Sequence, residues 1–201
     1  MLQHHVLPLE GSVGTASGAL GALAFLPYIA NVLQGRSSPQ RASWLIWATI
    51  STITFVSLVF EGAGPSLWFV GMQALGTTTI FLLSIFCGRG EYLSQSDYVI
   101  LSAAAIGIAL WLATENPAWS LAMNIAISAL GGSVTILKAY RRPATETLAT
   151  WVLLFFSAVL GLAATGGESW VLMAYPLYLA TLYGAITVAM LSGRMTTAAL
   201  R

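Results

Sequence analysis

Charged residues are scarce in this sequence. Of its 201 residues, 8 are Lys or Arg and 7 are Asp or Glu, which is 7% of the chain, against about 25% in an ordinary soluble domain. A soluble domain presents charge over much of its surface, whereas 57% of this chain is apolar and its mean hydropathy is +0.81. These values exclude a water-soluble globule and indicate an all-α integral membrane protein. The net charge of +1 leaves no basic surface for nucleic acid.

Cysteine and histidine are also scarce. The single cysteine, Cys87, has no partner for an internal disulfide, and the two histidines, His4 and His5, stand together near the N-terminus without the further ligands that a metal site needs. The sequence therefore predicts no metal and no cofactor. It also shows no Ser-His-Asp set, Cys-His pair or pair of carboxylates within plausible reach of each other, so we do not expect an enzyme.

Apolar runs of about 20 residues, the length that crosses a bilayer, divide the chain at its Gly, Pro and charged residues. No basic residue precedes the first run, so we expect that run to be retained as a helix and not cleaved as a signal peptide. We predict seven transmembrane helices, at Thr15–Gln34, Ser43–Phe60, Ser66–Phe86, Tyr98–Thr114, Ala118–Leu137, Thr147–Ala164 and Ser169–Leu191.

The charged residues favour this number of spans. Lys and Arg near the ends of spans prefer the cytoplasmic side. With seven spans, all 8 basic residues fall on one face, in the loops after spans one, three and five and in the C-terminal tail. Six or eight spans would put them on both faces. The sequence therefore predicts a multi-pass protein of the plasma or inner membrane, with its N-terminus outside and its C-terminus in the cytoplasm.

A shift of 104 residues superposes the two halves of the chain, including their basic loops and their glutamate loops. The superposed pairs include Pro39 and Pro143, Trp47 and Trp151, and Thr77 and Thr181. Two three-helix halves share one orientation only when a single helix separates them. We therefore predict a 3+1+3 parallel-repeat arrangement, with an N-terminal tail (1–14), a first bundle (15–86), a linker helix (98–114), a second bundle (118–191) and a C-terminal tail (192–201).

The first repeat resembles the PQ-loop pattern of the SWEET and SemiSWEET transporters. Leu26-Pro27-Tyr28-Ile29 lies in the first predicted helix, Gly35-Arg36-Ser37 follows in a short basic loop, and Ser43 opens the second helix. The topology is similar from about Gly14 to Leu191. The resemblance implies a transporter that works by alternating access of its two bundles.

The same resemblance implies roles for particular residues. The helix-one proline is the hinge of the family, a role that falls here on Pro27, while Gly131 stands at the corresponding position of the second repeat and supplies flexibility in another way. The substrate-contacting position of the third helix falls on Gln73, and its counterpart in the second repeat is Leu177, which Pro176 and Tyr178 flank. Each proline is either a hinge or a static kink of its membrane helix.

Polar and aromatic residues inside the predicted spans are the other candidates for a solute site. An amide in hydrocarbon needs a partner, so such side chains are expected to face the interior, either as contacts between helices or as ligands. Trp47 and Trp151 are either anchors at the membrane interface or face each other as a surface for a ligand. The candidate substrate-binding residues are Gln73, Asn31, Trp47, Ser51, Asn124, Trp151 and Tyr178, and the candidate hinges are Pro27, Gly131 and Pro176.

No acidic, basic or histidine side chain falls at the centre of a predicted span, so we expect neither proton or sodium coupling nor a strongly charged substrate. The leading hypothesis is a facilitator that moves a small neutral polar solute, such as a sugar, across the bilayer. Trp44-Leu45-Ile46-Trp47 spells the WxxW pattern of the PnuC vitamin transporters, which keeps a heterocyclic vitamin or an amino-acid-like solute as an alternative. A third alternative is a receptor or accessory protein, as the KDEL receptors are on this fold. Homo-oligomer formation is left open.

Overall fold

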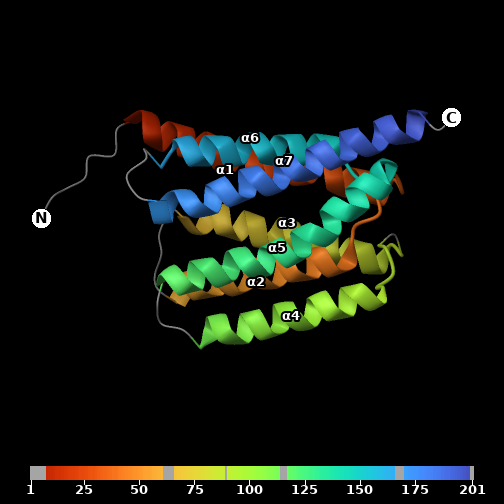
Figure 1. Ribbon diagram of the computed structural model, residues 1–201. Helices are drawn as coiled ribbons and strands as arrows, with labels where there is room; N and C mark the ends of the chain where they lie inside the picture. Colours follow the sequence, from red (N-terminus) through yellow and green to blue (C-terminus); the bar gives the residue numbers. More distant parts are fainter. Residues whose placement is uncertain (1–7, 61–65, 89, 114–116, 166–169, 200–201) are drawn as a thin grey trace, which may run out of the picture.

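The computed structural model describes residues 8–60, 66–88, 90–113, 117–165 and 170–199. These residues form seven α-helices that lie side by side, and they contain no β-strand (Figure 1). The helices are α1 (Pro8–Leu33), α2 (Arg41–Phe60), α3 (Ser66–Phe86), α4 (Gln95–Leu112), α5 (Pro117–Arg141), α6 (Leu148–Ala163) and α7 (Trp170–Ala199), and a 3-10 turn, η1 (Pro143–Thr145), precedes α6.

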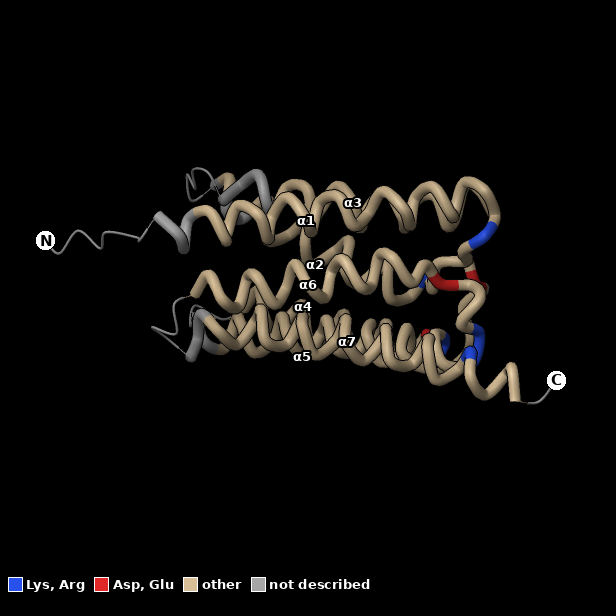
Figure 2. Tube along the Cα trace, turned by 90° about the horizontal axis from the view of Figure 1, so that it is seen from above, with Lys and Arg blue, Asp and Glu red and all other residues tan. Residues whose placement is uncertain are grey.

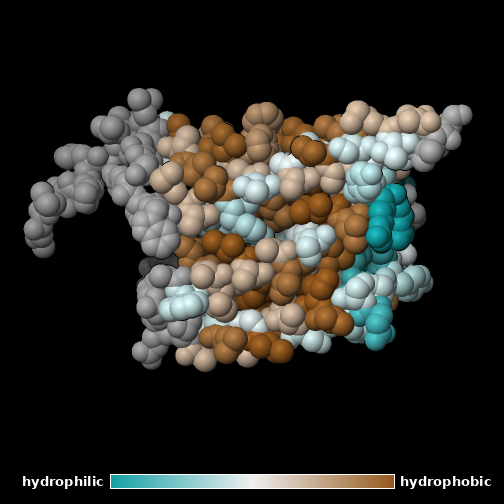
Figure 3. Space-filling view, viewed as in Figure 1, coloured by the Kyte–Doolittle hydropathy of each residue, from teal (hydrophilic) through white to brown (hydrophobic). Residues whose placement is uncertain are grey.

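The composition of the helices matches a membrane environment. Within the described parts of the chain, four stretches are long and apolar enough to cross a bilayer: Ser12–Leu33, Gln95–Leu112, Trp119–Arg141 and Met173–Ala199. Two shorter helical stretches, Gly71–Phe86 and Leu148–Ala163, are also apolar. Apolar side chains cover most of the middle of the bundle in Figure 3, and the most hydrophilic ones gather at one end. The fold therefore indicates an all-α integral membrane protein.

Several helices are longer than the sequence predicted. α1 begins at Pro8, α5 continues to Arg141, and α7 continues to Ala199, so that 192–199, expected as a tail, is helical. The predictions ended at polar residues, but backbone hydrogen bonds extend a helix beyond the apolar run wherever no Pro or unfavourable turn stops it. α4 begins before its predicted start because Ser94 and Asp97 form a capping box, in which each side chain accepts a hydrogen bond from the backbone N–H of the other.

The order of packing is the same in the two halves of the chain. α3 packs on both α1 and α2, and α7 packs on both α5 and α6. The described backbones of α1 and α2 do not pack directly on each other, and neither do those of α5 and α6. The halves meet along two seams, the α1–α6 seam and the α2–α5 seam, and α4 packs mainly on α5. Replacing each helix of the first half by its counterpart in the second converts one seam into the other.

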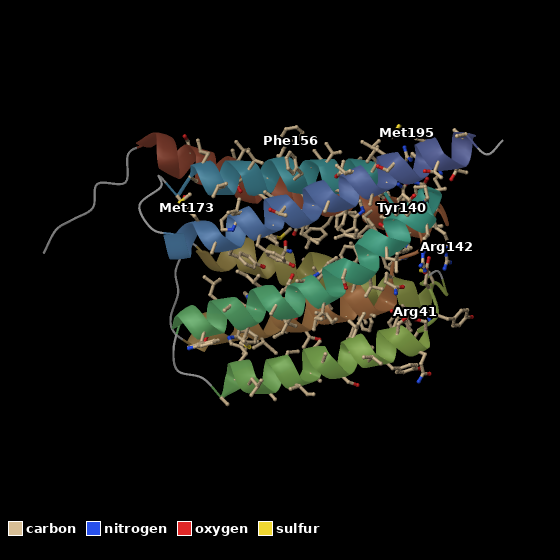
Figure 4. The ribbon with its side chains drawn as sticks, viewed as in Figure 1. Arg41, Tyr140, Arg142, Phe156, Met173 and Met195 are labelled. Carbon is tan, nitrogen blue, oxygen red and sulfur yellow. The ribbon has the colours of Figure 1, made fainter. Side chains whose placement is uncertain are left out.

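Figure 2 shows that the Lys, Arg, Asp and Glu residues coloured in it lie at one end of the bundle, which we name the charged end. Arg41 and Arg142 lie there, whereas Met173 lies at the far end and Phe156 points outward from α6 (Figure 4). α1 begins at the far end and α7 finishes at the charged end (Figure 1). Of the four glutamates that the sequence places on the face opposite the basic loops, Glu10 lies in the first turn of α1, and Glu61, Glu115 and Glu168 lie outside the described residues.

Candidate functional site

Two cavities lie between the halves of the molecule. The α2–α5 cavity has a volume of ≈ 320 Å³, and its walls come from α2, α3, α5 and α7. The α1–α6 cavity has a volume of ≈ 250 Å³, and its walls come from α1, α3, α6 and α7. The first volume is at the small end of the range for ligand sites, about 300 to 1,000 Å³, and the second is below that range. The cavities are adjacent because four residues line both of them: Gln73, Tyr175, Leu179 and Tyr183.

Polar side chains of α2 and α5 line the α2–α5 cavity, among them Ser51, Thr54 and Asn124. The Ser51 hydroxyl donates to the Trp47 carbonyl at 2.7 Å, and the Thr54 hydroxyl donates to the Ile50 carbonyl at 2.8 Å. Because the Thr54 proton is engaged within α2, the Thr54 oxygen remains an acceptor toward other groups. The Ser51 oxygen is also hydrogen-bonded to the Thr77 hydroxyl, at 2.9 Å. The side-chain oxygen of Asn124 is buried and has no hydrogen-bond partner within the described part of the chain. The walls therefore suit a solute that donates hydrogen bonds.

Four of the residues predicted to bind substrate line this cavity: Gln73, Trp47, Ser51 and Asn124. Thr54, Ser128, Tyr175 and Tyr183 line it as well, although the prediction did not include them. Tyr175, Leu179 and Tyr183 recur every four residues, the spacing that brings side chains to one face of a helix. That spacing was the available signal for this wall of α7.

The other three predicted residues lie outside the walls of both cavities. The Asn31 amide donates to the Thr147 hydroxyl at 3.1 Å, across the α1–α6 seam. Trp151 is fully buried, and its indole N–H donates to a carboxylate oxygen of Glu146 at 3.0 Å. Tyr178 is half-buried, and its ring centroid lies 6.2 Å from that of Tyr175. A direct contact with a solute in these cavities is therefore not available to Asn31 and Trp151 in this conformation.

Aromatic rings fill the interior between the cavities and the charged end. This aromatic cluster consists of Tyr28, Trp44, Trp47, Trp151 and Tyr183. The rings of Trp47 and Trp151, which the repeat superposes, lie 6.1 Å apart between centroids in an edge contact, so the two side chains meet in the interior. Tyr28 lies 4.9 Å from Trp44, and both are essentially unexposed. Such close packing of rings leaves no passage for a solute.

A buried ion pair lies beyond the aromatic cluster. The Lys138 ammonium is 2.6 Å from a carboxylate oxygen of Glu146, and the two side chains are 3% and 0% exposed. Lys138 also donates to the carbonyl oxygen of Ser38, which belongs to the segment between α1 and α2. Glu91, from the segment between α3 and α4, lies 3.9 Å from Lys138 and 3.2 Å from Arg142. These contacts, which we name the charged-end lock, tie the two halves together.

Equivalent hydrogen bonds cross the two seams near the charged end. The Ser43 hydroxyl donates to the carbonyl of Gly131 at 2.7 Å and accepts from the Thr135 hydroxyl at 2.8 Å, across the α2–α5 seam. The shift of 104 residues places Thr147 on Ser43 and Thr135 on Asn31. The Asn31–Thr147 hydrogen bond of the α1–α6 seam is thus the counterpart of the Thr135–Ser43 bond.

The three predicted hinges have different surroundings. A Cβ at Gly131 would lie 3.4 Å from both the Ser43 Cα and the Trp47 indole nitrogen, so the absence of a side chain lets α5 approach α2 closely. Pro27 lies inside α1 and Pro176 inside α7, and Pro176 lines the α1–α6 cavity. Their role as hinges stays a prediction.

The chain matches no known protein family, no curated protein and no solved structure. The described residues contain no group of three or more His, Cys, Asp or Glu side chains that could hold a metal ion.

Proposed function

We propose that the protein is a membrane transporter of the facilitator type. It moves a small, neutral, polar solute by alternating access of two three-helix bundles, which α4 joins in a seven-span, 3+1+3 arrangement. The N-terminus is outside and the C-terminus cytoplasmic. The observation that carries this proposal is the pair of cavities between the two halves, which the aromatic cluster closes off from the charged end.

The repeated packing supports two bundles that move against each other. α1, α3 and α2 pack in the same order as α5, α7 and α6, and the halves touch along two equivalent seams. Membrane transporters built from such repeats hold their substrate at the interface between the repeats, which rock around it. A receptor that binds its ligand in a groove on one face would have a filled interior, so the cavities between the halves favour transport over that alternative.

Because the charged end is closed, transport requires a step in which the two halves separate at that end. The contacts across the seams there are noncovalent, and they include the Ser43–Thr135 and Asn31–Thr147 hydrogen bonds and the charged-end lock. We propose that these contacts break when the cavities open toward the charged end and re-form when they open toward the far end. Bending at Pro27, Gly131 and Pro176 accompanies the exchange.

The walls of the cavities support transport of an uncharged solute. No Asp, Glu, His, Lys or Arg is among the described residues that line either cavity. Ion-coupled transporters commonly place such groups in the path, and a charged solute would require a fixed counter-charge there. We therefore propose that the solute moves down its own gradient, without proton or sodium coupling.

The experiment is solute uptake into liposomes that contain the purified protein. Sugars, nucleosides, vitamins and amino acids are first tested for thermal stabilisation of the protein, because a ligand stabilises the folded state that binds it. Each stabilising solute is then expected to equilibrate across the liposome membrane when no pH or sodium gradient is present. Strict dependence on either gradient contradicts uniport, and failure of every stabilising solute to cross contradicts transport.

Two variants make the assay specific for the site. Gln73→Ala removes a side chain that lines both cavities and is expected to abolish both the stabilisation and the uptake. Thr181→Ala is the matched control, since Thr181 is exposed and donates only to the carbonyl of Leu177 in its own helix. Uptake that is unchanged by Gln73→Ala would place the solute path elsewhere.

A further inference from the structure

We infer that Trp151 is a positioning residue that connects the walls of the cavities to the charged-end lock. Trp151 is fully buried and lines neither cavity, so it acts through its neighbours and not by touching the solute. It holds Glu146 of the lock in place and passes a displacement of the cavity walls on to that carboxylate. This inference rests on the proposed function, because it names a residue through which the solute site and the closed end affect each other.

Two aromatic residues of the cavity walls pack on Trp151. Tyr183 lines both cavities, and its ring centroid lies 6.1 Å from that of Trp151 in a tilted arrangement. Trp47 lines the α2–α5 cavity, and its ring meets that of Trp151 in the edge contact described above. Because a packed interior has few voids, a shift of either ring displaces Trp151.

The indole of Trp151 also reaches the charged-end lock. Its N–H donates to one carboxylate oxygen of Glu146 at 3.0 Å, and the other oxygen of that carboxylate lies 2.6 Å from the Lys138 ammonium. Lys138 in turn donates to the carbonyl of Ser38 in the first half. Hydrogen bonds to an ionised group are roughly twice as strong as those between neutral groups. Trp151 therefore fixes the carboxylate that directs Lys138 toward the other half.

The equivalent tryptophan of the first half has no such link. The shift of 104 residues places Ala42 on Glu146 and Gln34 on Lys138, so the corresponding positions carry no charge. The Trp47 indole donates instead to the backbone carbonyl of Ser128, at 3.3 Å. The repeat thus gives the two tryptophans equivalent places, but only Trp151 is bonded to the lock.

The test measures how often each end of the molecule opens, and it needs no solute. The full-length protein carries Cys87→Ser and one reporter cysteine, either Ser43→Cys near the charged end or Ser17→Cys in the part of α1 nearer the far end. Both serines are buried, and each donates to a carbonyl across its seam. A maleimide that does not cross membranes is applied to vesicles from the side of the charged end for Ser43→Cys and from the opposite side for Ser17→Cys.

Trp151→Phe keeps a ring in the aromatic cluster and removes the N–H. It is expected to raise the modification rate of the Ser43→Cys reporter about tenfold, because a hydrogen bond to a charged group no longer stabilises the closed end. The rate of the Ser17→Cys reporter is expected not to rise, whereas a general loosening of the fold would raise both rates. Trp151→Leu lacks the same N–H and replaces Trp151→Phe if that variant does not fold.

Trp44→Phe is the matched control. Trp44 belongs to the same cluster and is 1% exposed, but its indole nitrogen has no hydrogen-bond partner in the described part of the chain. The substitution is therefore expected to leave the ratio of the two modification rates unchanged.

Two combined variants test the two sides of the connection. In Lys138→Met/Glu146→Leu, which has no ion pair, Trp151→Phe is expected to cause no further rise at the Ser43→Cys reporter. Tyr183→Leu removes a ring that packs on Trp151 and is expected to raise the rate at this reporter. Combined with Trp151→Phe, it is expected to raise the rate by less than the product of the two separate factors, because both changes act through the same residue. Size-exclusion profiles and thermal unfolding report whether each variant is folded.

The outcomes separate this inference from the proposed function. The role of Trp151 is overturned by equal rises at both reporters, by no rise at the Ser43→Cys reporter in a folded Trp151 variant, or by the same change of ratio in Trp44→Phe. A further rise in Lys138→Met/Glu146→Leu, or factors that multiply with Tyr183→Leu, overturns it as well. Uptake of a solute by the unaltered protein still supports transport in each of these cases. If no variant opens the charged end to the maleimide and no solute crosses the liposome membrane, transport is contradicted too.

Discussion

Lys138 and Glu146 show what a charge needs in order to lie inside this molecule. Removing an ion of this size from water costs several kcal/mol even after relaxation of its surroundings, so a pair is tolerated only with good geometry and further hydrogen bonds. Here the two charges are 2.6 Å apart, the Ser38 carbonyl accepts from Lys138, and the Trp151 indole donates to Glu146. Each charge is thus matched, and loss of one partner leaves the other unmatched.

We predict that Lys138→Met destabilises the protein by about 3 to 5 kcal/mol, because Glu146 is left buried without its partner. The double variant Lys138→Met/Glu146→Gln is expected to recover most of this loss. The measurement is the free energy of unfolding in mixed micelles. Arg142→Gln is the control, since the Arg142 side chain is 64% exposed and its loss is expected to cost less than about 1 kcal/mol. Equal losses for Lys138→Met and Arg142→Gln would contradict a buried pair.

Single residues differ in how far the sequence predicted their positions. Amides in the middle of apolar runs were expected to face the interior, and Gln73 and Asn124 do line the α2–α5 cavity. Lys138 was expected in a basic loop, but α5 continues to Arg141 and carries Lys138 into the interior. Its contact with Ser38 joins residues 100 positions apart, and the sequence offers no local signal for such a contact.

The helices themselves were readable from the apolar runs, and each predicted run corresponds to a helix in the structure. The ends of the helices were not predicted accurately, because the runs indicate where side chains are apolar and not where backbone hydrogen bonding stops. The position of α3 between α1 and α2, and of α7 between α5 and α6, was also not predicted. That order depends on how side chains of different helices pack together. The spacing of apolar residues along one sequence does not show which helices are neighbours.

At the α2–α5 seam, the Ser43 and Thr135 hydroxyl oxygens are 2.8 Å apart, which suits a disulfide between cysteines at these positions. We predict that oxidised Ser43→Cys/Thr135→Cys, made with Cys87→Ser, binds solute but does not equilibrate it across liposomes, since the bond holds the charged end closed. Reduction is expected to restore uptake. The two single-cysteine variants serve as controls, and full uptake by the oxidised protein would show that this seam does not open.

The two ends of the whole molecule are chemically different. The Lys and Arg residues coloured in Figure 2 lie at one end, as the placement of basic loops in the sequence led us to expect. Positive charge near a membrane surface favours the cytoplasmic side, so the charged end is proposed to be cytoplasmic. The repeat pairs Thr54 with Ala158, but the sequence did not indicate that both residues line a cavity.

The only cysteine of the chain provides a direct test of the orientation. Cys87 is exposed and follows α3, whose last residue, Phe86, is near the charged end. We predict that a maleimide that does not cross membranes modifies Cys87 in inside-out vesicles but not in right-side-out vesicles. In Cys87→Ser/Ala113→Cys, the cysteine stands at the exposed C-terminal cap of α4, and the pattern is expected to reverse because α4 separates the two positions by one membrane crossing. If both cysteines are modified from the same side of the membrane, α4 does not cross the bilayer. If each cysteine is modified from the side opposite to the one expected, α4 crosses the bilayer but the charged end is not cytoplasmic.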